Sequence, residues 1–259
     1  MRTGDIMKYI KELQAKKIFT LADVTKLTGN DNTAKSLMRS YKKAGYITSV
    51  RRNLYASLDL ANGNVIANRY EIGCGVSETA YISHHSAMEF HGVANQVFFE
   101  VTISADENIR PFDFEGVSYR LTKATIADGV ISPPYNPLIK VTDIERTVID
   151  CIRDTDLAGG LEEVLECLRL IPQLDESRLL EYLSAYDQKN LWQKAGYLLE
   201  QYRDLFRLSD DFFDICKQNM GVRKNYLIEG DGLIYHPDWR MYAPEDLFSL
   251  LNEGDDVIV

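Results

Sequence analysis

Cations and small polar side chains share one face of a helix that the sequence predicts over residues 31–44. Helical spacing places eight of them there: Asn32, Thr33, Lys35, Ser36, Arg39, Ser40, Lys42 and Lys43. A solvated helix face usually mixes both signs of charge. A face that meets DNA excludes carboxylates, because phosphates repel them. No carboxylate is expected on this face, so the pattern predicts contact with a DNA groove, with Lys35, Ser36 and Arg39 at the base edges.

A second basic feature follows this helix. Two strand-like runs, Tyr46–Val50 and Leu54–Leu58, flank Arg51 and Arg52, and the pattern places both arginines at the tip of a β-hairpin. Cations at such a tip, and at the end of the preceding helix, suit phosphate groups. We therefore expect phosphate contacts from Lys42, Lys43, Arg51 and Arg52.

Two further helices would position the basic helix. Leu21–Thr28 has apolar residues at helical spacing, with Thr20 and Asp23 at the spacing of a capping box. Gly4–Lys17 is predicted as the first helix of the same module. Helix, tight turn, helix and basic hairpin are the elements of a winged helix-turn-helix, which places its second helix in the major groove. We predict such a DNA-binding domain over residues 1–60; the alternative is a three-helix domain with a basic surface.

Charge divides the chain into two parts. The 259 residues carry a formal net charge of −10. Residues 1–59 contain 12 Lys and Arg against 5 Asp and Glu, a net charge of +7, and the remaining 17 basic and 34 acidic residues give −17. A basic module joined to an acidic body is expected where only one end meets nucleic acid. DNA would repel the acidic part, so its expected partner is a protein or a small ligand.

Residues 61–259 are predicted to form an α+β domain with a mostly antiparallel sheet and a helical C-terminal half. Apolar periodicity and capping residues predict helices over residues 65–76, 83–90, 142–152, 161–170, 176–186, 191–205, 210–218 and 244–251. Strand-like runs occupy residues 97–104, 112–114, 117–122, 130–131, 139–141, 225–228 and 232–235. The expected fold class is α+β, a winged helix-turn-helix followed by a larger mixed domain.

Three histidines lie close together in the predicted helix 83–90 and just after it. His84 and His91 are seven residues apart and would share a helix face, which is compatible with metal ligation. No cysteine or carboxylate joins the histidines at ligand spacing, so capping or packing roles are favoured. His236 precedes a proline and is expected in a turn. We predict no metal site and no cofactor.

Three carboxylates and an arginine lie near the start of the predicted helix 142–152. Asp143, Glu145 and Asp150 are the kind of cluster that a nuclease or transferase uses to hold metal ions. A capping box over Thr142–Glu145 accounts for the first two, and Arg146 and Asp150 form an i, i+4 pair. A structural role is therefore favoured. No nucleophile motif or complete phosphate-binding loop is present, so no enzyme activity is expected.

The remaining composition points to the cytoplasm. The four cysteines, Cys74, Cys151, Cys167 and Cys216, lack C-x-x-C spacing and have apolar neighbours, which is typical of buried free thiols in a reducing compartment. No run of apolar residues is long enough to span a membrane. The first ten residues lack the apolar core of a signal peptide. We expect no membrane association.

Three segments of the chain resemble those of a known family. They are residues 81–97 (YISHHSAMEFHGVANQV), residues 140–151 (KVTDIERTVIDC) and residues 193–200 (QKAGYLLE). These segments are similar to motifs of the AbiEi-type antitoxins of type IV toxin–antitoxin and abortive-infection systems. The resemblance covers nearly the whole chain and places the winged module at the same end.

This resemblance implies a role in bacterial phage defence. The N-terminal winged helix of the family represses its own operon by binding repeats in double-stranded operator DNA. The C-terminal domain counteracts a nucleotidyltransferase-type toxin of the AbiEii kind, without the need for direct contact. The resemblance implies no catalytic residue.

Two other functions are compatible with the residues alone. One is a ligand-responsive winged-helix transcriptional regulator without a toxin partner. The other is a DNA-directed enzyme with Asp143, Glu145 and Asp150 as metal ligands. A thermal shift with one metabolite would favour the first, and divalent-metal-dependent cleavage or transfer would favour the second.

Overall fold

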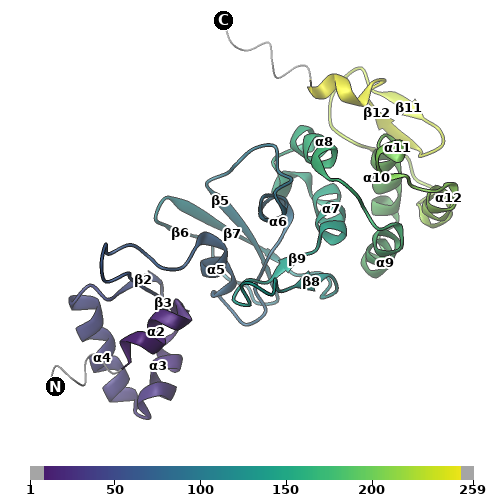
Figure 1. Cartoon of the computed structure of the whole chain (residues 1–259). Coiled ribbons are helices and arrows are strands. Elements are labelled where there is room, and N and C mark those ends of the chain that lie inside the picture. The colour runs from purple at the N-terminus through teal and green to yellow at the C-terminus, as the bar shows by residue number, and fades with distance from the viewer. Residues whose placement is uncertain (1–8, 252–259) are drawn as a thin grey trace, which may run out of the picture. The chain divides into compact units, whose positions relative to one another are not determined.

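The computed structural model describes residues 9–251 and contains both helices and strands, which confirms the α+β class (Figure 1). Contacts group these residues into two compact units, each assembled from separate chain segments. The first unit comprises residues 9–82, 99–123 and 132–140, and the second comprises residues 83–98, 124–131 and 141–251. The expected boundary after residue 60 falls inside the first unit. The division into domains 1–60 and 61–259 stays a prediction.

Three helices and a three-stranded sheet make up residues 10–57 of the first unit. The helices are α2 (Ile10–Lys16), α3 (Leu21–Thr28) and α4 (Asp31–Lys43), and the strands are β1 (Ile18–Phe19), β2 (Ile47–Arg51) and β3 (Leu54–Ser57). The strand order is β1-β3-β2, with both pairs antiparallel. The helices and the hairpin lie close to their expected positions, whereas β1 was not expected. The part of the expected first helix before residue 9 lies outside the described residues.

Local hydrogen bonds determine where α3 and α4 begin. The side chains of Thr20 and Asp23 each accept the other's backbone N–H, which confirms the expected capping box. Gly29 ends α3 at a φ of +70°, in the left-handed region that glycine tolerates best. Asn30 then caps α4, because its Oδ1 accepts the N–H groups of residues 32 and 33. The apolar side of α4 packs into a core with Ile10, Leu13, Phe19, Val24 and Ile47.

Helix α5 (Arg69–Cys74) and four neighbouring strands complete the first unit. The strands are β4 (Tyr81–Ile82), β5 (Glu100–Ala105), β6 (Phe112–Phe114) and β7 (Val117–Lys123), in the order β6-β7-β5-β4. Strands β5 and β7 are parallel, and the other two neighbouring pairs are antiparallel. The pairing of these strands is therefore mixed, parallel between β5 and β7 and antiparallel elsewhere.

Two elements begin later than expected. The helix expected over residues 65–76 is reduced to α5, because the side chain of Asn68 accepts the N–H groups of Tyr70 and Glu71 and caps it there. The strand expected from Val97 begins at Glu100, and the side chains of Val97 and Phe99 are 74% and 80% exposed. The apolar residues of this segment predicted a buried strand, but the side chains of Val97 and Phe99 are exposed and precede β5.

The second unit is mostly helical. Its helices are α6 (His84–His91), α7 (Ile144–Arg153), α8 (Leu161–Leu170), α9 (Glu176–Tyr186), α10 (Lys189–Glu200), α11 (Arg203–Phe206) and α12 (Asp210–Asn219), with short 3₁₀ helices η1 (Thr155–Ala158) and η2 (Leu247–Leu251). Strands β8 (Val130–Ile131) and β9 (Val141–Thr142) pair antiparallel. Strands β10 (Asn225–Tyr226), β11 (Ile234–His236) and β12 (Met241–Ala243) form a sheet in the order β10-β12-β11.

Helix α7 is the central helix of this unit and packs against α6, α8, α9 and α10 (Figure 1). Several expectations about the helices and strands of this part of the chain are wrong in detail. The helix expected over residues 191–205 is divided into α10 and α11, and the expected final helix is the shorter η2. Strand β12 was not expected, and Ile139 precedes β9 instead of belonging to it.

A glycine in α10 makes room for the largest fully buried side chain of the described residues. Trp239 is 1% exposed, and a Cβ atom on Gly196 would lie only 2.1 Å from its ring. The indole N–H donates to Glu200 at 2.6 Å. Gln193 Nε2 donates to the carbonyl oxygens of Trp239 and Arg240 at 2.6 and 2.8 Å. These contacts attach the β10–β12 sheet to α10.

The cysteines and the helices allow two further comparisons with expectation. All four cysteines are free and buried, which confirms that they do not form disulfides. Within residues 9–251, none of the helices combines the length and the apolar composition that crossing a bilayer requires.

Candidate functional site

The residues expected to meet DNA lie together on the exposed side of α4. Ser40 is half-buried, and the other seven are exposed: Asn32, Thr33, Lys35, Ser36, Arg39, Lys42 and Lys43. The opposite side, formed by Ala34, Leu37, Met38 and Tyr41, is buried. The helix therefore presents its cations to solvent while its apolar side is held by the core.

The expectation that this face contains no carboxylate is wrong at its first turn. Asn30 supplies the cap, so Asp31 is the first residue of α4 and lies four positions before Lys35. The Lys35 ammonium contacts the Asp31 carboxylate at 2.5 Å and lowers its pKa. Both side chains are exposed, and exposed ion pairs are weak. Lys35 can therefore exchange this carboxylate for a polar or anionic group of a ligand.

The two arginines of the β2/β3 hairpin differ in their exposure to solvent. Arg52 is exposed, whereas Arg51 is half-buried and its guanidinium lies over the Phe112 ring, 5.1 Å from the ring centroid. Lys42 Nζ donates to Ser49 Oγ of β2 at 2.8 Å. This bond connects the C-terminal end of α4 to the hairpin, so the two basic features belong to one surface.

The carboxylates near the start of α7 are engaged by neighbouring side chains. Asp143, rather than the expected Thr142, caps the helix, because its Oδ1 accepts the N–H of Arg146 while Thr142 belongs to β9. Asp143 Oδ2 accepts from Arg178 Nη2 at 2.6 Å and from Tyr182 Oη at 2.5 Å.

Glu145 does not complete the expected capping box. Its Oε1 accepts the backbone N–H of Asp175 at 2.9 Å, and Oε2 lies 3.7 Å from Arg178 Nη1. The Asp175 side chain caps α9, so Glu145 of α7 is bonded to the start of that helix. These contacts give Asp143 and Glu145 a structural role at the junction of α7 and α9.

The expected pair of Arg146 and Asp150 is formed and fully buried. Arg146 Nε donates to Asp150 Oδ1 at 2.8 Å, and each side chain is 1% exposed. Arg146 Nη1 also donates to the carbonyl oxygens of Ile126 and Asp128, and the hydroxyl of Tyr186 donates to Asp150 Oδ1. The pair joins α7 to α9 and to residues 126–128.

The histidines expected to have capping or packing roles occupy separate environments. His84 is buried, with Nδ1 2.9 Å from Ser83 Oγ, and has a φ of +52°, which is unusual for a non-glycine residue. His91 Nε2 donates to the Thr142 carbonyl at 2.7 Å. His236, expected in a turn, is the last residue of β11, and its Nε2 donates to the Pro244 carbonyl at 3.2 Å.

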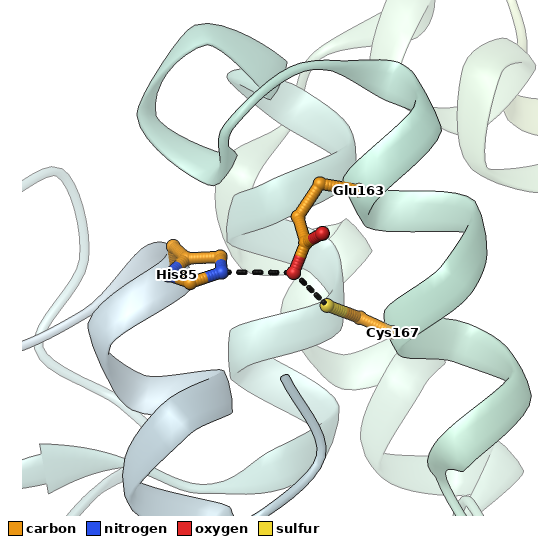
Figure 2. A group of neighbouring side chains, drawn as sticks. All are labelled: His85, Glu163 and Cys167. Atoms are coloured by element: carbon orange, nitrogen blue, oxygen red, sulfur yellow. Dashed lines mark hydrogen bonds and ion pairs between the residues drawn. The ribbon is translucent and has the colours of Figure 1, made fainter. Parts of the chain in front are cut away.

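His85 is the histidine that meets a carboxylate and a cysteine (Figure 2). Its Nε2 donates to Glu163 Oε1 at 3.0 Å, and Cys167 Sγ donates to the same oxygen at 3.3 Å. Its Nδ1 lies 3.4 Å from Glu89 Oε1, and its ring stacks on Phe98. The expectation that no carboxylate or cysteine joins the histidines is therefore wrong for His85. The partners come from α8, more than seventy residues away in sequence.

Hydrogen bonds satisfy the Glu163 carboxylate without a metal ion. The ligand atoms of His85, Glu163 and Cys167 lie within 4.8 Å of one another, a spacing that a metal could use. However, Glu163 Oε1 also accepts the backbone N–H groups of Asn95 and Gln96 at 3.1 and 2.9 Å. Burial also raises the pKa of Cys167 to about 12, which keeps the thiol protonated. We interpret the group as a clamp that attaches residues 95–96 to α6 and α8.

Protonation of His85 is predicted to stabilise the second unit. Burial lowers the pKa of His85, but the contacts with Glu163 and Glu89 outweigh it and leave the pKa raised. Because the pKa of His85 is higher in the folded than in the unfolded protein, its protonation stabilises the fold at pH values below the ordinary imidazole pKa. This stabilisation is lost as the pH rises through the pKa of the folded state. The difference in Tm between wild type and His85→Gln should therefore be larger at about pH 6 than at about pH 9. A difference that is constant with pH would contradict a charged His85.

Sequence comparisons found no match, whereas comparison with solved structures found chains of similar fold. No protein-family model matches the chain, and no curated protein matches its sequence. Among solved structures, the RV2827C protein from Mycobacterium tuberculosis is similar, with a TM-score of 0.64 over 95% of this chain and 93% of that chain. The two chains share a fold. At 14% sequence identity, the likeness carries no information about function.

Sequence reasoning missed the partners of His85 but contained a signal for two of them. Glu163 and Cys167 are four residues apart in a helix that was expected, so they had to share a helix face. Which other element that face meets could not be read from spacing. Likewise, nothing in the sequence around Phe112 indicated that its ring lies under Arg51.

Proposed function

We propose that the protein is a DNA-binding antitoxin that represses its own operon. The observation that carries the proposal is the basic face of α4, on which Lys35, Arg39, Lys42 and Lys43 are exposed to solvent. The net charge of +7 over residues 1–59, against −17 for the remainder, supports DNA contact at this end. The expected partner is double-stranded operator DNA with repeated half-sites, bound in the cytoplasm.

The arrangement of α3, α4 and the β2/β3 hairpin supports a winged helix-turn-helix. A tight turn at Gly29 and Asn30 joins α3 to α4, and the hairpin follows α4 directly. In this motif the second helix enters the major groove and the hairpin lies along the backbone. We assign base contacts to Lys35, Ser36 and Arg39. Phosphate contacts are assigned to Lys42, Lys43, Arg51 and Arg52, with Asn32 and Thr33 at the start of the helix.

The proposed role of the acidic part is to counteract a toxin of nucleotidyltransferase type. Its support is the resemblance of residues 81–97 and 140–151 to AbiEi-type antitoxins. Those segments form α6 and α7, whose side chains make the buried contacts of the second unit. They would thus maintain the fold of the acidic part instead of contacting the toxin themselves.

Substitution of Arg39 tests the DNA-binding proposal. Arg39→Ala should weaken binding to the DNA upstream of the protein's own gene by about 5- to 150-fold, the range of one base contact. Arg52→Ala should weaken binding to every sequence and reduce the salt dependence by about one unit. Both effects are measured by fluorescence anisotropy over a series of salt concentrations. Arg169→Ala, an exposed arginine of α8, is the matched control. If Arg39→Ala and Arg52→Ala both bind DNA with the affinity of wild type, this surface is not the DNA-binding surface.

A further inference from the structure

An open groove of about 600 Å³ lies in the first unit beside the β2/β3 hairpin. Three arginines line it, Arg51 and Arg52 of the hairpin and Arg110 of the loop before β6. We call it the arginine groove. Asn53 and Asn108 also line it, and none of its lining residues in the described part of the chain is an Asp or a Glu. In a chain with a net charge of −10, three cations without a carboxylate are a marked departure from mixed charge.

Specific contacts hold the groove in shape. Arg51 Nη1 donates to the Arg110 carbonyl at 3.4 Å, and the Arg51 guanidinium rests on the Phe112 ring. Asn53 has a φ of +61°, and its Oδ1 accepts the N–H of Leu21 at 3.3 Å. The carbonyl bond takes one of the five N–H groups of Arg51, and the bond to Leu21 leaves the Asn53 amide nitrogen as a donor. The groove therefore offers donors that are already oriented.

The nearest acidic residue in sequence to the groove has other partners. Glu107 Oε2 accepts from Ser77 Oγ at 2.8 Å and from Thr79 Oγ1 at 2.5 Å. This carboxylate is thus tied to residues 77 and 79 and does not pair with Arg110 in the structure. The side chain of Arg110 is exposed.

We propose that the arginine groove binds a backbone phosphate of the operator, so that Arg110 extends the DNA interface beyond residues 1–60. Guanidinium groups bind phosphate oxygens through paired N–H donors, and three of them around one groove suit a phosphodiester. DNA is the favoured source of that phosphate because the groove is continuous with the α4 face. Lys42 of α4 is bonded to Ser49 of β2, and the same strand ends at Arg51. This inference rests on the proposed DNA-binding function and adds a contact from outside the winged module.

The test compares Arg110→Gln with Arg120→Gln in the full chain. Arg120 is also exposed in the first unit, but it pairs with Glu100 on neighbouring strands, so its loss is a matched change of charge away from the groove. Arg110→Gln should weaken binding to operator and scrambled DNA alike, by about 5- to 10-fold at about 0.1 M salt, and reduce the salt slope by about one. Arg110→Lys should retain the slope and recover part of the affinity. Arg120→Gln should match wild type.

Three results would overturn the inference. If Arg39→Ala weakens binding but Arg110→Gln does not, the groove lies outside the interface and the proposed function stands. If Arg39→Ala, Arg52→Ala and Arg110→Gln all leave binding unchanged, the proposed function fails as well. If inorganic phosphate at constant ionic strength raises the Tm of wild type but not of Arg110→Gln, while DNA affinity is unchanged, the groove binds free phosphate instead. Far-ultraviolet circular dichroism of each variant establishes that it is folded.

Discussion

The Asp150→Ala variant is expected to lose about 3–5 kcal/mol of unfolding free energy, because it leaves the buried Arg146 guanidinium without its counterion. Arg146 and Asp150 are each 1% exposed, so water cannot replace the lost carboxylate. The hydroxyl of Tyr186 loses its acceptor at the same time. A domain is stable by only about 5–15 kcal/mol, so this loss is large. Urea denaturation of the full chain, followed by circular dichroism, measures it.

An exposed ion pair of the same unit is the control. Arg169 Nη1 lies 3.0 Å from Glu166 Oε1 in α8, with the two side chains 45% and 30% exposed. Glu166→Ala should cost less than about 1 kcal/mol. Replacing both members of the buried pair, with Arg146→Met and Asp150→Ala together, should cost less than the sum of the single substitutions. Equal losses for Asp150→Ala and Glu166→Ala would show that burial of the Arg146–Asp150 pair has no energetic consequence.

A chain that carries Lys35→Ala and Arg39→Ala together is expected to lose operator repression completely and still protect cells from the toxin. Both side chains are exposed on α4, so the substitutions leave the core of the first unit unchanged. The segments that resemble an antitoxin lie mainly in the second unit, whereas α4 belongs to the first. Expression from an unrelated promoter removes autoregulation from the result. Growth after induction of the adjacent toxin gene measures protection.

The reciprocal variant completes this experiment. Asp143→Ala should retain repression. It removes the cap of α7 and the contact with Arg178, so it should reduce protection only to the extent that the second unit unfolds. If the Lys35→Ala, Arg39→Ala double variant fails to rescue growth at wild-type protein levels, protection acts through repression alone. The acidic part would then be a sensor or an oligomerisation element.

Local signals predicted most of the helices. The capping box of Thr20 and Asp23, the cap at Asn30 and the cap at Asp175 all lie within three residues of the helix starts that they determine. Such signals need no knowledge of the rest of the fold. The same holds for the β6/β7 hairpin, where Glu115 and Gly116 both have positive φ, as a two-residue turn of type I′ requires.

Elements that depend on distant contacts could not be predicted in this way. Thr142 looked like a helix cap, but its backbone pairs with β8 and its hydroxyl lies 2.7 Å from Thr147 Oγ1, so the cap moves to Asp143. Strand β12 has only three residues, and its position follows from packing against α10. For the candidate site, the exposed face of α4 followed from helical spacing. The position of Arg110 beside Arg51 and Arg52 could be found only from the tertiary structure.

The interleaved composition of the two units affects how the chain can fold during its synthesis. The chain passes from one unit to the other five times, after residues 82, 98, 123, 131 and 140. Residues made late are needed by residues made early, because the Asn136 amide donates to the buried Glu71 carboxylate and the Ile82 backbone N–H donates to the Lys140 carbonyl. Large proteins generally fold domain by domain as they leave the ribosome, N-terminal part first. Here the first unit cannot be completed until residue 140 has emerged, when residues 83–98 and 124–131 of the second unit are already outside. The nascent chain must therefore keep both units incomplete at once, and no single break in the backbone could later separate them.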